Sequence, residues 1–272
     1  MFDYYTNGKI KSVATSLTAT FKLVLDGTRI DYFPNGKRQR TTEFKKGEPI
    51  GFITNYYPNG QLYNRLKISR QYYPGFSLYY YDDIYHTYYY QHDVNMVELR
   101  DSTGKILIQD GNGHDLVFDD DFKQLVAEGN LKNNKREGEW RGPIADSGRF
   151  ICVYHKDAIK SGVSYMKSGH HYTFNQIATE TVFSDGVNAF DDFIKKNLQY
   201  PESAKKRKIE GRVTIGFYVE INGTLSDIKI VKGLFKSLDD EVLRVINSSP
   251  LWMPASQFGI PERMYHTVNV YF

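Results

Sequence analysis

The sequence has one cysteine, no long apolar run and little excess charge, and each shortage excludes a class of protein. Cys152 is the only cysteine, so no internal disulfide framework can form. No run of 18 apolar residues occurs, which excludes a membrane-spanning helix within these 272 residues. The formal net charge of +3 is too small to indicate a nucleic-acid-binding protein. The composition is otherwise that of an ordinary globular chain, in which 40% of residues are hydrophobic.

Residue patterns typical of enzymes and metal sites are also missing. Adjacent side chains of a strand point to opposite faces, so His170 and His171 make a poor chelating pair. The three aspartates at 119–121 lack the alternating oxygen ligands and the distal glutamate of a calcium loop. Cys152 and His155 have no third orienting group nearby in the sequence, so a buried cysteine is the better interpretation. We therefore predict a protein that is not an enzyme, with no catalytic residue, no metal and no cofactor.

Tyrosine and glycine are abundant, and together they favour sheet over helix. The chain has 22 tyrosines and 22 glycines. Three similar blocks, each with two aromatic residues shortly before an Asn-Gly pair, occur at 4–9, 32–37 and 56–61. Each Asn-Gly pair predicts a two-residue hairpin turn. A short repeat cannot bury a face alone, so neighbouring repeats must stack into one sheet.

The segment 128–140, with Gly129, Gly138 and Trp140, resembles a MORN repeat, and the Asn-Gly blocks look like its bacterial variant. The resemblance implies that residues 1–178 form an N-terminal antiparallel β-hairpin repeat sheet. A tyrosine-rich patch at 72–90 lies inside this region. It either packs within the sheet or forms an aromatic platform for a glycan, a peptide or a lipid head group.

The last part of the chain has a different pattern, which predicts a separate domain at 185–272 after a linker. Apolar residues at 190–198 recur at helical spacing behind a plausible N-cap at Asn188, and Pro201 ends that helix. Residues 213–221 alternate as in a half-buried strand, and Asn222-Gly223 predicts a hairpin back to a second strand. A second helix follows, capped by Ser237, with an apolar stripe that ends at Ile246. A final alternating strand is predicted over 264–272.

Four short landmarks of this domain carry a resemblance. They are Leu198-Gln199-Tyr200-Pro201, Gly211-Arg212-Val213, Asp239-Asp240-Glu241-Val242-Leu243-Arg244 and Trp252-Met253-Pro254. In this order they resemble the TonB C-terminal domain of Gram-negative bacteria. The resemblance implies a small α+β module with two helices on a three-stranded antiparallel sheet, which makes the whole chain α+β. It also implies a binding module that catalyses nothing.

The resemblance further implies that a partner peptide, such as a segment of an outer-membrane transporter, adds beside the last strand. The predicted partner-binding residues are Met264, Tyr265, His266, Thr267, Val268, Asn269, Val270 and Tyr271. We expect the more apolar alternate set, Met264, His266, Val268, Val270 and Phe272, to face the helices. An uncovered edge strand invites pairing, so a partner peptide, a second copy in a homodimer or a piece of the repeat region should occupy it.

Location and function are expectations of the same kind. Met1 is followed at once by Phe2 and Asp3, without the pattern of an export signal, so the chain read literally would be cytoplasmic. The resemblance instead implies a periplasmic or cell-envelope protein whose export signal is absent from this chain, related to outer-membrane transport. The alternative is a scaffold whose MORN-like sheet binds protein, glycan or membrane surface, with membrane contact at most peripheral. Basic residues crowd 195–212, either as a solvated helix face or as a contact for an acidic partner segment.

Overall fold

The computed structural model describes residues 2–17, 24–68, 94–145, 147–183, 186 and 189–272. The chain divides into two compact units, Met1–Gly169 and His170–Phe272, and this division precedes both predicted boundaries, 178 and 185. The tyrosine patch at 72–90 and the expected N-cap at Asn188 lie outside the described residues. No described helix has the length and apolarity needed to cross a membrane.

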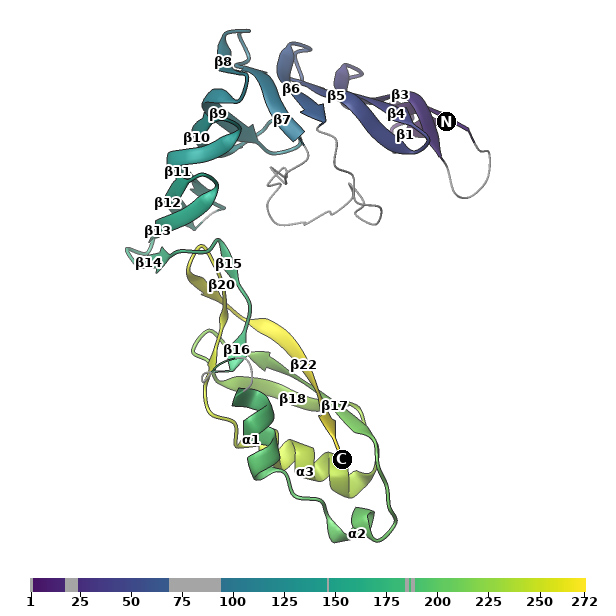
Figure 1. Cartoon of the computed structure of the whole chain (residues 1–272), viewed down its shortest axis with the longest axis vertical. Coiled ribbons are helices and arrows are strands. Elements are labelled where there is room, and N and C mark those ends of the chain that lie inside the picture. Colours follow the sequence, from purple (N-terminus) through teal and green to yellow (C-terminus); the bar gives the residue numbers. More distant parts are fainter. Residues whose placement is uncertain (1, 18–23, 69–93, 146, 184–185, 187–188) are drawn as a thin grey trace. The chain divides into compact units, whose positions relative to one another are not determined.

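The first unit is an antiparallel sheet in which each strand pairs with the next one along the chain (Figure 1). The predicted antiparallel sheet is confirmed, and the described residues of this unit contain no helix. The strands are β1 (Phe2–Tyr4), β2 (Ile10–Ser16), β3 (Leu25–Tyr32), β4 (Arg38–Lys45), β5 (Glu48–Tyr56), β6 (Leu62–Ile68), β7 (Val94–Arg100), β8 (Ile106–Gln109), β9 (Asn112–Phe118), β10 (Leu125–Lys132), β11 (Lys135–Ile144), β12 (Gly148–His155) and β13 (Ala158–Met166).

The repeated Asn-Gly turns are not the predicted two-residue turns. In the block at 32–37, the Phe33 amide donates to Lys37 O at 2.8 Å and the Gly36 amide donates to Phe33 O at 2.8 Å. Gly36 has a φ of +85°, whereas Asn35 stays in the usual negative range. This geometry is a three-residue loop with a glycine bulge. The Asn35 side chain accepts the Lys37 amide at 2.9 Å, which favours the longer loop over a two-residue turn.

Two-residue turns do occur in this sheet, but at other sequences. Two consecutive residues with positive φ join the strands at Lys46-Gly47, Asp110-Gly111, Asn133-Asn134 and Lys156-Asp157. Such pairs define type I′ turns. Each bonds to a neighbouring hairpin; for example, the Asn134 amide donates to Gly111 O at 2.9 Å. The sheet is therefore held together by its turns as well as by its strand ladders.

Aromatic side chains form much of the core of the first unit. Phe122, in the loop after β9, packs against Tyr57 at 5.0 Å and Tyr63 at 4.9 Å between ring centroids. Trp140 of β11 lies over Gly129 of β10, where a side chain would meet the indole at 2.3 Å. In these contacts, tyrosines supply core packing and a glycine leaves room for a neighbouring aromatic ring.

The described residues of the second unit form three helices and a three-stranded antiparallel sheet in the order β18-β17-β22. The prediction had two helices; the one-turn α2 and the small pairings β15-β20-β21 and β16-β19 are additional. The elements are β14 (His171–Phe174), β15 (Ala178–Thr179), β16 (Val182–Phe183), α1 (Ala189–Asn197), α2 (Glu202–Lys205), β17 (Arg212–Val219), β18 (Leu225–Lys232), α3 (Lys236–Asn247), β19 (Trp252–Met253), β20 (Ala255–Gln257), β21 (Ile260–Glu262) and β22 (Met264–Tyr271).

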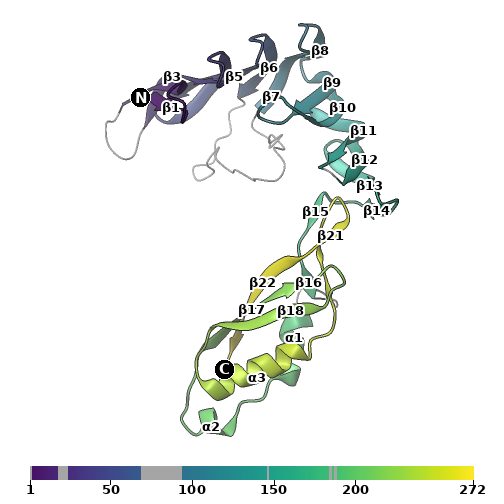
Figure 2. The same cartoon turned by 180° about the vertical axis from the view of Figure 1, so that it is seen from behind.

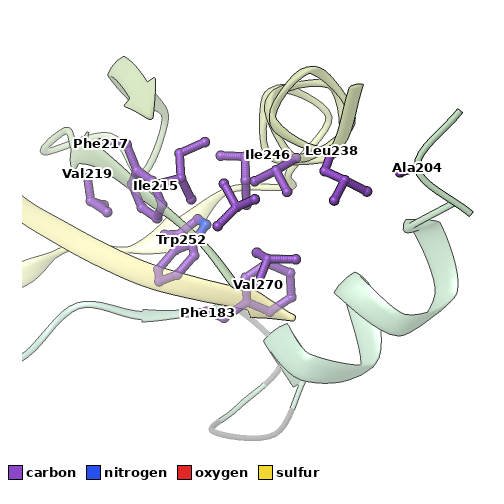
Figure 3. Packing of buried hydrophobic residues seen from close by; sticks show 11 residues of the cluster. Phe183, Ala204, Ile215, Phe217, Val219, Leu238, Ile246, Trp252 and Val270 are labelled. Carbon is purple, nitrogen blue, oxygen red and sulfur yellow. The ribbon is translucent and has the colours of Figure 1, made fainter. Parts of the chain in front are cut away.

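Both α1 and α3 pack on one face of this sheet (Figures 1 and 2). Alternate residues of β17 point into the core and are fully buried, as the period of two predicted: Val213, Ile215, Phe217 and Val219. The apolar stripe of α3 covers them (Figure 3). Ser237 is not the cap of α3, because the helix begins at Lys236 with Phe235 as its N-cap.

Phe183 belongs to the same core although it lies before the predicted start of the domain at 185. It is 4% exposed and packs edge-on against Trp252 at 5.4 Å. Its strand β16 pairs with β19, which places Phe183 opposite Trp252 in the register. The fold of the second unit therefore includes residues that the helix and strand patterns assigned to a linker.

Candidate functional site: the outer edge of the last strand

Strand β22 lies at one edge of its sheet, next to β17. The two strands pair in an unbroken antiparallel register from Arg212↔Tyr271 to Val219↔Met264. Within the part of the chain that the structure describes, no strand pairs with the other side of β22 and no loop backbone bonds to it. The predicted edge is therefore present and uncovered among these residues.

The side chains of β22 alternate between the two faces of the sheet. Val268 and Phe272 pack against the core, and Val270 is 2% exposed, as predicted. Tyr265 and Tyr271 lie on the opposite face and are 40% and 67% exposed. Met264 differs from the prediction. It is 39% exposed, at the first position of the strand.

The last pair of the ladder shows which amides of β22 face outward. Gly211 and Phe272 exchange two backbone hydrogen bonds, of 3.2 and 2.9 Å. In an antiparallel pair, residues that exchange bonds alternate with residues that do not. The unbroken register therefore gives an inward amide to four residues of the strand, Met264, His266, Val268 and Val270. The outward N–H and C=O groups belong to the other four residues of the strand, Tyr265, Thr267, Asn269 and Tyr271.

The opposite edge of the sheet is less suited to pairing. The register between β17 and β18 is interrupted twice, and Asp227 within β18 has a φ of +51°. Lys229 and Lys232 are exposed on the same strand. Bulges and charges of this kind protect an edge from added strands. By contrast, β22 contains no Asp, Glu, Lys or Arg.

An aromatic and ionic contact fixes the start of β22. The Arg263 guanidinium lies 3.5 Å from the centroid of the Tyr218 ring and forms ion pairs with Glu220 at 2.8 Å and Asp227 at 2.6 Å. Tyr218 also packs against Tyr265, its cross-strand neighbour, at 5.1 Å. These contacts hold the N-terminal end of the edge strand against the β17–β18 hairpin.

A segment rich in basic residues lies next to the other end of the strand. Tyr200 packs on Phe272 at 5.8 Å, and its hydroxyl donates to Ile209 O at 2.5 Å, which holds the segment 200–211 beside the end of β22. The five cations here are Lys205, Lys206, Arg207, Lys208 and Arg212. Because α2 spans only Glu202–Lys205, a solvated helix face accounts for Lys205 but not for the other four.

His266 is the one ionisable side chain of β22 that points toward the core. It is packed between Phe217 at 5.9 Å and Trp252 at 5.4 Å. Burial lowers the pKa of His266 below its ordinary value, and the nearby charge of Glu180 opposes that shift. The neutral imidazole is therefore the form that the fold favours.

The residues weighed as chemical candidates have structural roles. His155 bonds to Glu137 at 2.9 Å, and burial raises the pKa of the Cys152 thiol to about 11, which makes it a poor nucleophile. Asp119 accepts backbone amides of its own turn, and Asp121 pairs with Lys123 at 2.6 Å. Across the described residues, no group of three His, Cys, Asp or Glu side chains is placed to hold a metal ion.

Comparisons with known families agree with both resemblances. Residues 196–272 match the family of the Gram-negative bacterial TonB protein C-terminal, and residues 25–46, which span β3 and β4, match the MORN repeat variant. No curated protein matches the chain. The TonB C-terminal family is a non-enzymatic interaction domain of the cell envelope. The second unit thus carries a C-terminal domain of the Gram-negative TonB type, and it follows a sheet that contains a MORN repeat variant.

Proposed function

We propose that this chain is a non-enzymatic, periplasmic protein-binding module of the cell envelope, in which an extended segment of a partner protein pairs with β22. The observation that carries the proposal is the outer edge of that strand, which is regular, uncharged and uncovered among the described residues. Its outward amides and carbonyls offer main-chain bonds to an added strand, and its alternating side chains offer specificity.

The energetics of the edge favour a partner of moderate affinity. A main-chain hydrogen bond contributes about 0.5–1.5 kcal/mol net, and ordering an extended peptide costs part of that gain. The Tyr265 and Tyr271 side chains, both well exposed, add apolar contact area on one face of the new strand. Because the second unit resembles the TonB C-terminal domain, we take the partner to be a segment of an outer-membrane transporter.

The test compares two substitutions at each of two outward positions in the full chain. Thr267→Pro and Asn269→Pro remove an outward amide, whereas Thr267→Val and Asn269→Val keep the amide and change only the side chain. We expect partners captured from an envelope extract by the parent to be retained by both valine variants and lost with both proline variants. Folding is checked in a Trp140→Phe background, in which the emission comes from Trp252, a buried core residue of this unit.

Two results would contradict the proposal. Proline variants that fold and still retain the same partners would show that β22 is not the recognition edge. A parent that is dimeric by ultracentrifugation, with a monomeric Thr267→Pro variant, would assign the edge to a second copy of the chain instead.

A further inference from the structure

The charges at the two ends of β22 differ in sign. At its C-terminal end, the segment 202–212 carries the five cations described above and only two carboxylates, Glu202 and Glu210. At its N-terminal end, Arg263 forms ion pairs with two carboxylates, Glu220 and Asp227, and Lys229 lies 5.9 Å from the Tyr265 ring. With Glu262, the carboxylates at this end outnumber the cations. The strand between these ends carries no Asp, Glu, Lys or Arg.

The cations at the C-terminal end are available to a ligand. Lys206, Lys208 and Arg212 are exposed, and among the described residues they form no ion pair. Lys205 approaches Glu202 only at 3.8 Å. Arg212 lies directly opposite Tyr271 in the register, on the open face of the sheet.

The backbone holds this basic segment at the C-terminal end of β22. Gly211 bonds twice to Phe272, and Lys208 has a φ of +50°, in a turn that closes on Ala204 and Lys205. A peptide that runs along β22 therefore reaches the cations when it passes Tyr271. Exposed charges interact over about 10 Å at 0.1 M salt, a range that covers the last residues of such a peptide.

We propose that the partner segment is uncharged where it pairs with β22 and carries acidic residues at the end that reaches Lys206 and Arg212. This inference rests on the proposed strand pairing and adds the charge of the partner to it. Acidic residues at that end would speed the encounter and fix the register, whereas basic residues would be repelled.

The probes are four labelled peptides that share a seven-residue core of alternating threonine and valine. Two carry a pair of aspartates, before or after the core, and two carry a pair of lysines at the same places. Binding to the full chain is measured by fluorescence anisotropy at low and high salt. Because each exposed ion pair contributes little, we expect an aspartate peptide to bind about five- to tenfold tighter than its lysine counterpart at low salt.

Two variants and one control locate the effect. In the Lys206→Glu/Arg212→Glu variant, the preference for aspartate should disappear or reverse. Lys232→Glu changes an exposed cation on β18, at the far edge of the sheet, and should leave the preference intact. Thr267→Pro should weaken the binding of all four peptides.

The outcomes separate this inference from the strand pairing on which it rests. If aspartate and lysine peptides bind equally well, and Thr267→Pro abolishes the binding of both, the strand pairing stands and the inference of an acidic partner is wrong. A preference for aspartate that survives Lys206→Glu/Arg212→Glu would also overturn it. Binding that a folded Thr267→Pro variant retains in full, or no binding of any probe to the parent, would contradict both.

Discussion

The hydroxyl oxygen of Tyr265 lies only 1.9 Å from the point where a Cβ atom of Gly216 would stand. Tyr265 belongs to the edge strand β22 and Gly216 to the central strand β17, so a side chain of the edge strand covers a bare stretch of backbone on its neighbour. Glycine is required here by space and not by conformation, because its φ lies outside the left-handed region. The edge strand is thus fixed by shape as well as by its ladder.

Gly216→Ala should destabilise the second unit by about 1–3 kcal/mol, because the added methyl group must displace the Tyr265 ring. The two tryptophans of the chain fall in different units, so a Trp140→Phe background leaves Trp252 as the reporter of this one. Urea unfolding followed by Trp252 emission measures the change. In a Tyr265→Ala background the same substitution should cost less, and an equal cost would contradict the contact.

The second unit should fold alone as residues 170–272 and should be weakened as residues 185–272. The shorter fragment lacks Phe183 and the β16–β19 pairing, and loss of a buried phenylalanine costs about 3–5 kcal/mol. Thermal unfolding is measured for residues 170–272, for residues 185–272 and for the Phe183→Ala variant of the longer fragment. If the two fragments unfold at the same temperature, Phe183 does not contribute to the stability of this core.

The stability of the second unit should fall as the pH drops from about 7.5 toward 5.5. Burial depresses the pKa of His266 in the folded state, so its contribution is complete above the unfolded pKa of about 6.5 and declines as the pH falls below that value. His266→Gln, which cannot titrate, should flatten the profile in this range. A parent profile as flat as that of the variant would show that His266 is not buried in neutral form.

In the repeat sheet, Gly129→Ala should destabilise the first unit by about 1–3 kcal/mol, because a methyl group there would overlap the Trp140 ring. Trp140 emission in a Trp252→Phe background reports the change. Gly36→Ala provides a comparison with a different cause. It meets no neighbouring atom but has a φ of +85°, and it should cost about 1 kcal/mol through backbone strain alone.

Much of this architecture could be predicted from local sequence. The alternation at 213–219 indicates a strand with one buried face because the period of two follows directly from strand geometry. The spacing of Leu238, Val242 and Ile246 likewise indicates the buried stripe of α3. The position of β22 at an edge followed from the resemblance, since a strand pattern alone does not reveal its neighbours.

Other features depend on contacts between distant residues, and local patterns carried no sign of them. Phe183 looks like part of a linker because a two-residue strand is too short to show a period. The Asn-Gly pairs predict two-residue turns, but they form three-residue loops. The asparagine side chain accepts the amide two residues on and stabilises the longer loop. Arg263 showed no pattern at all, since its partners Tyr218, Glu220 and Asp227 lie about 40 residues earlier.

Hydrogen exchange of individual amides along β22 in the full chain tests the central claim most directly. The amides of His266, Val268, Val270 and Phe272 should be protected by their bonds to β17, whereas those of Tyr265, Thr267, Asn269 and Tyr271 should exchange rapidly. Addition of a bound peptide should protect the second set and leave the first unchanged. Equal protection of both sets in the free chain would show that the outer edge is already paired, and would contradict the account.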